Sequence, residues 1–150
     1  MDRSQFRHKI QIRVRNYEVD WQGIVHNANY LLYCEVARLE YLKHLGVTVD
    51  FKTVNGPSKV VVVRNEIDYR SPLRFDDLAD VYTRVSFIRN TSFAMEGLVE
   101  RAGTGELVST NFAYHVWLDS RSNAPIPVPE EFRTLVAGFE GPHCEIAKIP

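Results

Sequence analysis

The sequence has few cysteines and no long apolar run. These two features argue against a disulfide-stabilised protein and against a membrane-spanning one. It contains two cysteines, Cys34 and Cys144, so a disulfide framework is not expected, and free thiols are typical of a reducing compartment. The longest aliphatic run, Val60 to Val63, is far too short to span a bilayer. The first residues, MDRSQFRHK, lack the apolar core of a secretory signal. We therefore expect a cytoplasmic protein that does not insert into a membrane.

The chain also lacks an excess of charge and several known catalytic motifs. It has 18 Lys and Arg against 19 Asp and Glu, a formal net charge of -1, which favours neither nucleic acid nor a charge-driven partner. A Gly-x-Ser-x-Gly elbow, a phosphate-binding loop and a dinucleotide fingerprint are all absent from the sequence. Its five histidines show no paired metal-ligand spacing. We expect no bound cofactor, no metal site and no nucleic-acid partner.

The 150 residues, of which 45% are hydrophobic, suffice for one domain with a core. Residues 8–17 alternate between apolar and polar, which predicts a strand with one buried face. From about Asn27 to Leu45 the pattern is helical, with Asn27 and Asn29 as candidate N-caps and Gly46 as the terminator. The apolar residues of this helix spread over most of its circumference, which predicts that the helix is buried nearly all round.

Four further strands are predicted after a loop at residues 55–57. Their expected ranges are Lys59 to Tyr69, Asp80 to Ile88, Ser92 to Arg101 and Val108 to Leu118. In the last of them, simple alternation places Val108, Thr110 and Phe112 on one side. Hairpin-like turns between the strands favour an antiparallel meander, and Pro129 suits the first turn of a short helix through Phe139. The sequence therefore predicts a single α+β domain over residues 1–150, with one long helix against a curved antiparallel sheet.

A short polar segment precedes the long helix and carries a family resemblance. It reads Asp20-Trp21-Gln22-Gly23-Ile24-Val25-His26-Asn27-Ala28-Asn29-Tyr30. This order of Asp, Gly, Val and Asn-Tyr resembles the active-site segment of hotdog-fold thioesterases of the hydroxybenzoyl-CoA and short-chain acyl-CoA type. The similarity continues, in the expected order, at Glu35, Ala37, Arg38, Tyr41, Leu42, residues 67–69, 72–74, 76–77 and 125–127. It spans roughly residues 10 to 130.

The resemblance implies a hotdog fold, in which an antiparallel sheet wraps one long central helix. It implies an acyl-CoA substrate and a homo-oligomer, either a dimer whose sheets join edge to edge or a homotetramer of two such dimers. It also implies a site at the dimer interface, between the start of the helix in one subunit and loops of the other.

Thioester hydrolysis requires a carboxylate that attacks the carbonyl carbon or activates a water, and fixed donors that stabilise the oxyanion. The start of a helix offers free N–H groups and the positive end of the helix dipole. The resemblance assigns Asp20 as nucleophile or general base, and the backbone N–H near Asn27 as oxyanion donor. The structural alternative for Asp20 is a turn or capping acceptor.

Further substrate contacts are expected around these two residues. Near the helix start the candidates are Trp21, Gly23, Val25, His26 and Tyr30. Trp21 and Tyr30 could instead be packing residues, and His26 a polar residue at the rim. For the CoA phosphates we expect Arg89, Thr91 and Ser92, which lie in a turn between two predicted strands, ahead of Arg64 and Arg70. Any of these arginines could equally be a solvated surface residue.

Two other functions remain consistent with the sequence. A hotdog acyl-thioester hydratase or dehydratase uses a histidine-centred dyad on the central helix, but this helix carries only His44, near its far end. A non-catalytic acyl-CoA-binding module is the second alternative, because a fold alone does not establish activity. Cys34 lies within an apolar run, where a thiol is usually inert. The preferred acyl group is left open.

Overall fold

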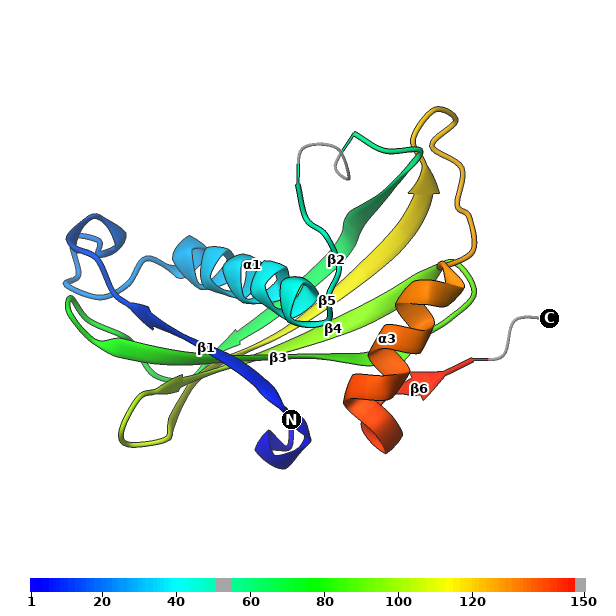
Figure 1. The fold of residues 1–150 in the computed structure, drawn as a ribbon. Coiled ribbons are helices and arrows are strands. Elements are labelled where there is room, and N and C mark those ends of the chain that lie inside the picture. The colour runs from blue at the N-terminus through cyan, green and yellow to red at the C-terminus, as the bar shows by residue number, and fades with distance from the viewer. Residues whose placement is uncertain (51–54, 148–150) are drawn as a thin grey trace.

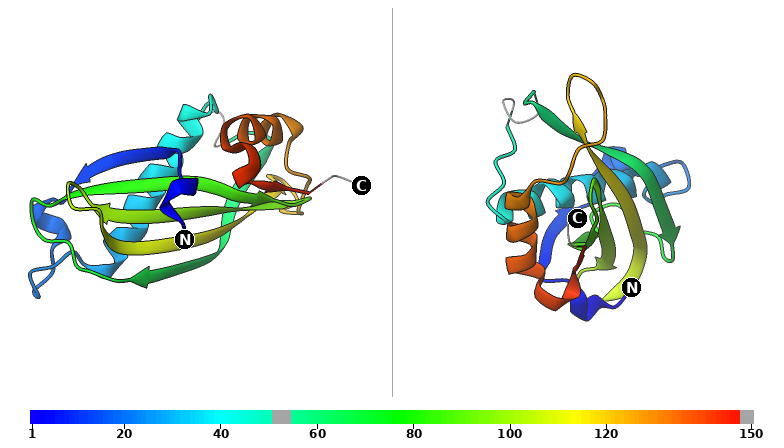
Figure 2. Two further views of the ribbon diagram at one scale, coloured as in Figure 1. Left: turned by 90° about the horizontal axis from the view of Figure 1, so that it is seen from below. Right: turned by 90° about the vertical axis from the view of Figure 1, so that its right-hand side faces the viewer.

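An antiparallel sheet curves around one side of a long helix, α1 (Figures 1 and 2). The computed structural model describes residues 1–50 and 55–147. In chain order, the strands and α-helices of these residues are β1 (His8–Arg13), α1 (Asn27–His44), β2 (Ser58–Tyr69), β3 (Leu78–Ile88), β4 (Ser92–Arg101), β5 (Glu106–Asp119), α3 (Glu130–Glu140) and β6 (Glu145–Ile146). None of the described helices has the length and apolar character needed to cross a bilayer.

The sheet has the order β1-β3-β4-β5-β2, and its pairs are antiparallel except for the short β6, which runs parallel to β3 beyond the N-terminal end of β1. This arrangement confirms the predicted hotdog fold. The ranges of β2 to β5 agree with the predicted strands to within two residues. The first strand is shorter than predicted, since it ends at Arg13 and the chain then forms a 3-10 turn at Asn16–Glu18.

Helix α1 packs one face tightly against the sheet. Tyr33, Cys34, Ala37 and Tyr41 on this face are buried. Beneath them lies Gly97 of β4, where an added Cβ atom would stand only 3.2 Å from the Cys34 sulfur. Burial raises the pKa of the Cys34 thiol to about 11, which fits the inert role expected for it.

The opposite face of α1 is open, so the prediction of a helix buried nearly all round is wrong for a single chain. Leu32 is 59% exposed and Val36 is 45% exposed. Their side chains are apolar, but the sheet wraps only part of the helix. At the far edge of the sheet, Val60 and Val62 of β2 are also exposed, at 41% and 44%. Two apolar surfaces are therefore left uncovered on neighbouring elements.

A β-bulge in β5 changes which side chains of this strand face α1. Val99 pairs with Ser109 and Glu100 pairs with Leu107, so Val108 is the extra, unpaired residue. Val108 therefore lies in the core, whereas Phe112 and Tyr114 pack against Phe87 on the other side of the sheet. The predicted single row of side chains was wrong because strict alternation fails at a bulge.

A buried carboxyl group connects α3 to α1 and to the sheet. Glu140, at the end of α3, is fully buried, and its Oε1 accepts hydrogen bonds from the Tyr41 hydroxyl at 2.6 Å and from the Val85 N–H at 3.1 Å. Burial outweighs these hydrogen bonds and raises the pKa of Glu140 above its ordinary value.

We expect the Glu140→Gln variant to show a flatter dependence of stability on pH. A carboxyl whose pKa is raised by folding stabilises the protein fully below its ordinary pKa of 4.5, and this contribution is lost as the pH rises through the folded value. The wild type should therefore lose stability above that pH, and the variant should not. The measurement is Tm between pH 4 and pH 8, with Glu130→Gln at the exposed start of the same helix as the control. Equal slopes in all three proteins would contradict the expectation.

Candidate active site

The segment between β1 and α1 folds into a tight turn that fixes the Asp20 carboxylate. The Asp20 N–H donates to the Ile24 carbonyl at 2.9 Å, and the Gly23 N–H donates to the Asp20 carbonyl at 3.0 Å. Gly23 has a φ of 76°, a left-handed conformation that favours glycine. The Gln22 N–H donates to Asp20 Oδ1 at 2.8 Å, whereas Oδ2 has no hydrogen-bond partner within the described residues. One carboxylate oxygen is thus held, and the other is available to a substrate.

Helix α1 begins with a histidine cap. Nδ1 of His26 accepts a hydrogen bond from the Ala28 N–H at 3.2 Å, so the neutral ring carries its proton on Nε2. The prediction that Asn27 or Asn29 caps the helix was wrong, because both lie inside its first turn. The Asn29 side chain instead donates to the Glu18 carbonyl at 2.8 Å. The Asn27 N–H has no acceptor in the described part of the chain and remains free to donate.

Glu18, which we did not single out from the sequence, holds this turn against α1. Its buried carboxylate accepts hydrogen bonds from Arg15 and, at 2.8 Å, from the Tyr33 hydroxyl, while its carbonyl accepts from the His26 N–H at 2.9 Å. Burial alone would raise the pKa of Glu18, but the hydrogen bonds from Arg15 and Tyr33 outweigh it and lower the pKa below its ordinary value. Glu18 therefore remains ionised near neutral pH.

Asp20 and Asn27 line the same pocket, which has a volume of about 540 Å³. The pocket brings together most of the residues predicted around the helix start, namely Asp20, Trp21, Val25, His26, Asn27 and Tyr30. Gly23 shapes the turn without lining the pocket. Trp21 is 93% exposed and stands at the rim, whereas the Tyr30 ring is buried. A free carboxylate oxygen and a free backbone donor therefore share one cavity.

The opposite wall of the pocket consists of Tyr69 at the end of β2 and the following residues Arg70, Ser71 and Pro72. The Tyr69 hydroxyl donates to the Asn27 carbonyl at 3.1 Å, which joins this wall to the start of α1. Arg70 is exposed and lies 3.4 Å from Asp68 in an ion pair. It is the predicted phosphate-binding candidate that the fold brings to this pocket.

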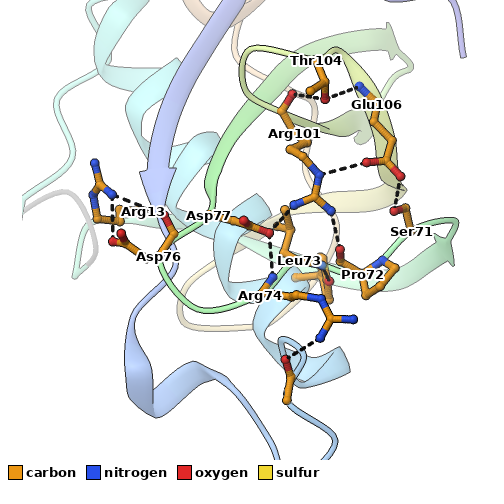
Figure 3. A network of polar contacts seen from close by, with 12 residues as sticks. Arg13, Ser71, Pro72, Leu73, Arg74, Asp76, Asp77, Arg101, Thr104 and Glu106 are labelled. Carbon is orange, nitrogen blue, oxygen red and sulfur yellow. Dashed lines mark hydrogen bonds and ion pairs between the residues drawn. The ribbon is translucent and has the colours of Figure 1, made fainter.

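A network centred on Arg101 supports this wall (Figure 3). The guanidinium group of Arg101 donates to the Pro72 carbonyl at 2.7 Å and to Glu106 at 2.9 Å, and it also pairs with Asp77. Glu106 in turn accepts a hydrogen bond from the Ser71 hydroxyl. Arg101 lies on β4, and its partners come from β5 and from the connection between β2 and β3. The network therefore fixes the wall relative to the sheet.

The same connection is bonded to the Asp20 turn and to α1. The Val25 N–H donates to the Leu73 carbonyl at 2.8 Å, and the Leu73 N–H donates to the Tyr30 hydroxyl at 3.0 Å. A longer contact of 3.5 Å joins the Arg74 side chain to the Gly23 carbonyl (Figure 3). The two walls of the pocket therefore form one hydrogen-bonded unit.

Arg89, Thr91 and Ser92 lie elsewhere in the chain. Arg89 and Thr91 belong to the β3–β4 turn, and Ser92 is the first residue of β4. The Arg89 guanidinium lies 5.1 Å from the centre of the Phe87 ring, and none of the three lines the Asp20 pocket. His44, the residue considered for a dehydratase, is exposed at the far end of α1 and contacts His8 and Phe139. Neither group approaches Asp20 within one chain.

Comparisons with known proteins identify relatives over most of the chain. The family model of the thioesterase-like superfamily matches residues 14–136. YneP of Bacillus subtilis, a putative acyl-CoA thioesterase, is 33% identical over 132 residues, covering 88% of this chain and 94% of that protein. A thioesterase of Thermus thermophilus, solved with coenzyme A and Zn, is 31% identical with a TM-score of 0.79, covering 91% of this chain and 96% of that one. The acyl-acyl carrier protein thioesterase ATL3 of Arabidopsis thaliana is 28% identical, covering 91% and 70%.

Proposed function

Because the chain belongs to the thioesterase-like superfamily and is a thioester hydrolase, we propose that it hydrolyses an acyl-CoA to a free acid and CoA, with Asp20 carrying the reaction. The observation that carries the proposal is the presence of the unpaired Asp20 Oδ2 and the free Asn27 N–H at one pocket. Relatives named acyl-CoA thioesterases support the choice of CoA as the carrier.

The proposed reaction uses both groups at the thioester carbonyl. The Asp20 carboxylate either attacks the carbonyl carbon or takes a proton from the water that attacks it. The electron pair moves to the carbonyl oxygen, and the Asn27 N–H stabilises the resulting oxyanion, aided by the positive end of the α1 dipole. Collapse of the intermediate expels the CoA thiolate, which takes up a proton. If Asp20 attacks directly, the acyl group is left as a mixed anhydride on its carboxylate, and a water then cleaves this anhydride to the free acid and restores Asp20. One water is consumed for each thioester cleaved.

The CoA phosphates require cations, and we propose that Arg70 supplies one at the pocket. The other predicted contacts, Arg89, Thr91 and Ser92, line no part of this pocket within one chain. We propose that they reach the phosphates from a second subunit.

A thiol-release assay over a panel of acyl-CoAs tests the proposal. The same acyl groups should be offered on acyl carrier protein, since a relative in Arabidopsis thaliana is named for that carrier. We expect turnover of CoA thioesters that depends on Asp20. Binding of acyl-CoA without turnover would replace the proposal with a binding module, and turnover restricted to the carrier protein would change the substrate.

We further propose that two copies pair at β2 to form a dimer. β2 is an edge strand, and it lies next to the open face of α1 that carries Leu32 and Val36. An exposed edge with apolar side chains is a ready site for pairing with a second chain. A homotetramer would then be a pair of such dimers.

The Val62→Asp variant should therefore be a monomer, because it places a charge in the proposed interface. Size-exclusion chromatography with light scattering measures the change. Leu107→Asp is the control, since Leu107 is 38% exposed but lies at the β4–β5 hairpin. A wild type that is itself monomeric, or a Val62→Asp variant that remains dimeric, would contradict the proposal.

A further inference from the structure

A second and larger cavity lies beside the C-terminal half of α1. Its volume is about 800 Å³, and we refer to it as the chamber. Its apolar walls include Leu39 and Leu42 of α1, Phe93 of β4, Trp117 of β5 and Phe132 of α3. None of the residues of the Asp20 turn lines it. The hollow is partly open to solvent, since Val60 and Val62 in its wall are 41% and 44% exposed. A largely apolar hollow of this size is typical of a ligand-binding site.

The charged residues that line the chamber are two acids and two bases, Glu35, Asp50, Arg38 and Lys59, so their formal charges sum to zero. Arg38 is paired with Glu35, which neutralises its guanidinium group. The His115 ring stacks flat on Phe93, with ring centres 4.8 Å apart and planes 8° apart. Burial lowers the pKa of His115 to about 4, so its ring is neutral at pH 7. The chamber therefore suits a hydrocarbon group better than an ionic one.

The chamber and the Asp20 pocket both lie between α1 and β2. Asn27 and Tyr69 line the pocket, whereas Leu39 and Val62 line the chamber. An α-helix rises about 1.5 Å per residue, so the chamber begins about 12 Å beyond Asn27, at Glu35, and extends to about 22 Å, at Leu42. A group bound at the start of α1 would need an extension of that length to fill it.

We infer that the chamber binds the hydrocarbon tail of a long-chain acyl group whose thioester lies at Asp20. An extended protein backbone advances about 3.6 Å per residue over three bonds, which is about 1.2 Å per bond. An extended hydrocarbon chain advances about as far per bond. About ten carbons then reach the near end of the chamber and about eighteen reach its far end, which sets the substrate class at about 12 to 18 carbons. The inference rests on the proposed function, since tail length affects turnover only if the thioester is cleaved at Asp20.

The Leu39→Trp variant tests the inference by filling the chamber. Leu39 is half-buried on α1 and lies outside the closely packed core clusters, so a larger side chain there can extend into the cavity. We expect kcat/KM for palmitoyl-CoA to fall at least about tenfold more than kcat/KM for hexanoyl-CoA. Lys43→Trp is the control, because Lys43 is exposed on the same helix and does not line the chamber.

Equal losses with both substrates, or no loss with either, would overturn the inference. Val49→Trp, which fills the chamber from the loop after α1 and also lies outside the core clusters, replaces Leu39→Trp if that variant does not fold. Binding to the inactive Asp20→Asn protein separates this inference from the proposed function. In that background palmitoyl-CoA should bind more tightly than hexanoyl-CoA, and Leu39→Trp should abolish the difference. If no acyl-CoA is turned over but palmitoyl-CoA still binds more tightly than hexanoyl-CoA, only the proposed function is wrong. If the two acyl-CoAs bind with equal affinity, the inference is wrong.

Discussion

The Asp20→Asn variant is expected to lose about 10²- to 10⁴-fold in kcat, the range for removing a positioned acid–base group, while still binding acyl-CoA. Asparagine keeps the size of the side chain, and its carbonyl oxygen can still accept the hydrogen bond from the Gln22 N–H. The turn should therefore persist, and only the negative charge is lost. Thiol release gives kcat, and calorimetric titration with a slowly hydrolysed acyl-CoA gives the affinity.

Asp76→Asn is the matched control. Asp76 is exposed and pairs with Arg13 at the surface, away from the Asp20 pocket. Its φ of 69° is one that asparagine adopts readily, so the substitution should leave the fold unchanged. Near-normal turnover in Asp20→Asn would show that this carboxylate serves only as a turn acceptor. Equal losses in both variants would point to a general effect of lost charge.

The second large effect is expected from Glu18→Ala, in both stability and kcat. The substitution leaves the buried Tyr33 hydroxyl without its acceptor, which alone costs about 1–3 kcal/mol. It also releases Arg15 from the 3-10 turn that precedes Asp20. The Glu18 carboxylate contacts Arg15 and Tyr33, and neither residue lines the Asp20 pocket. Glu18 is therefore a positioning residue, and kcat should fall by a larger factor than KM rises.

The pH dependence and a double-mutant cycle identify the origin of this loss. Folding lowers the pKa of Glu18, so its contribution is present above the ordinary value of 4.5 and is lost as the pH falls through the folded value. The difference in Tm between wild type and variant should therefore narrow in acid. Tyr33→Phe completes the cycle, and Glu40→Ala, which removes an exposed ion pair on the same helix, is the control. Unchanged kcat in Glu18→Ala at a temperature where it is folded would limit Glu18 to a stabilising role.

Local patterns in the sequence were enough to predict most of the fold. Period-two alternation gave the range of β4, and Gly46, which adopts a φ of 86°, was correctly predicted to end α1. The resemblance around Asp20 led to a turn that does lie at the start of the helix. These features depend on residues close together in the chain, where spacing alone carries the information.

Features that depend on distant parts of the chain were not predicted. Nothing near Val108 in the sequence indicates a bulge, because the bulge is defined by its pairing with β4. The exposure of Leu32 depends on how far the sheet reaches around α1. Glu18 gives only a weak local signal, an acid three residues after Arg15, since its partner Tyr33 belongs to the helix. The chamber likewise requires five elements to meet, α1, β2, β4, β5 and α3.

The close approach of Gly97 to Cys34 makes the middle of α1 intolerant of substitution. With 3.2 Å between the Cys34 sulfur and the position of a Cβ atom on Gly97, even alanine would push the two apart. A helix moves as a rigid body, so the displacement would pass along α1 to Asn27, two turns away. Random mutagenesis should therefore recover folded proteins of low activity that are altered at Gly97. The damage to catalysis would arise from misalignment of the proposed oxyanion donor, without any change in the residues around the substrate.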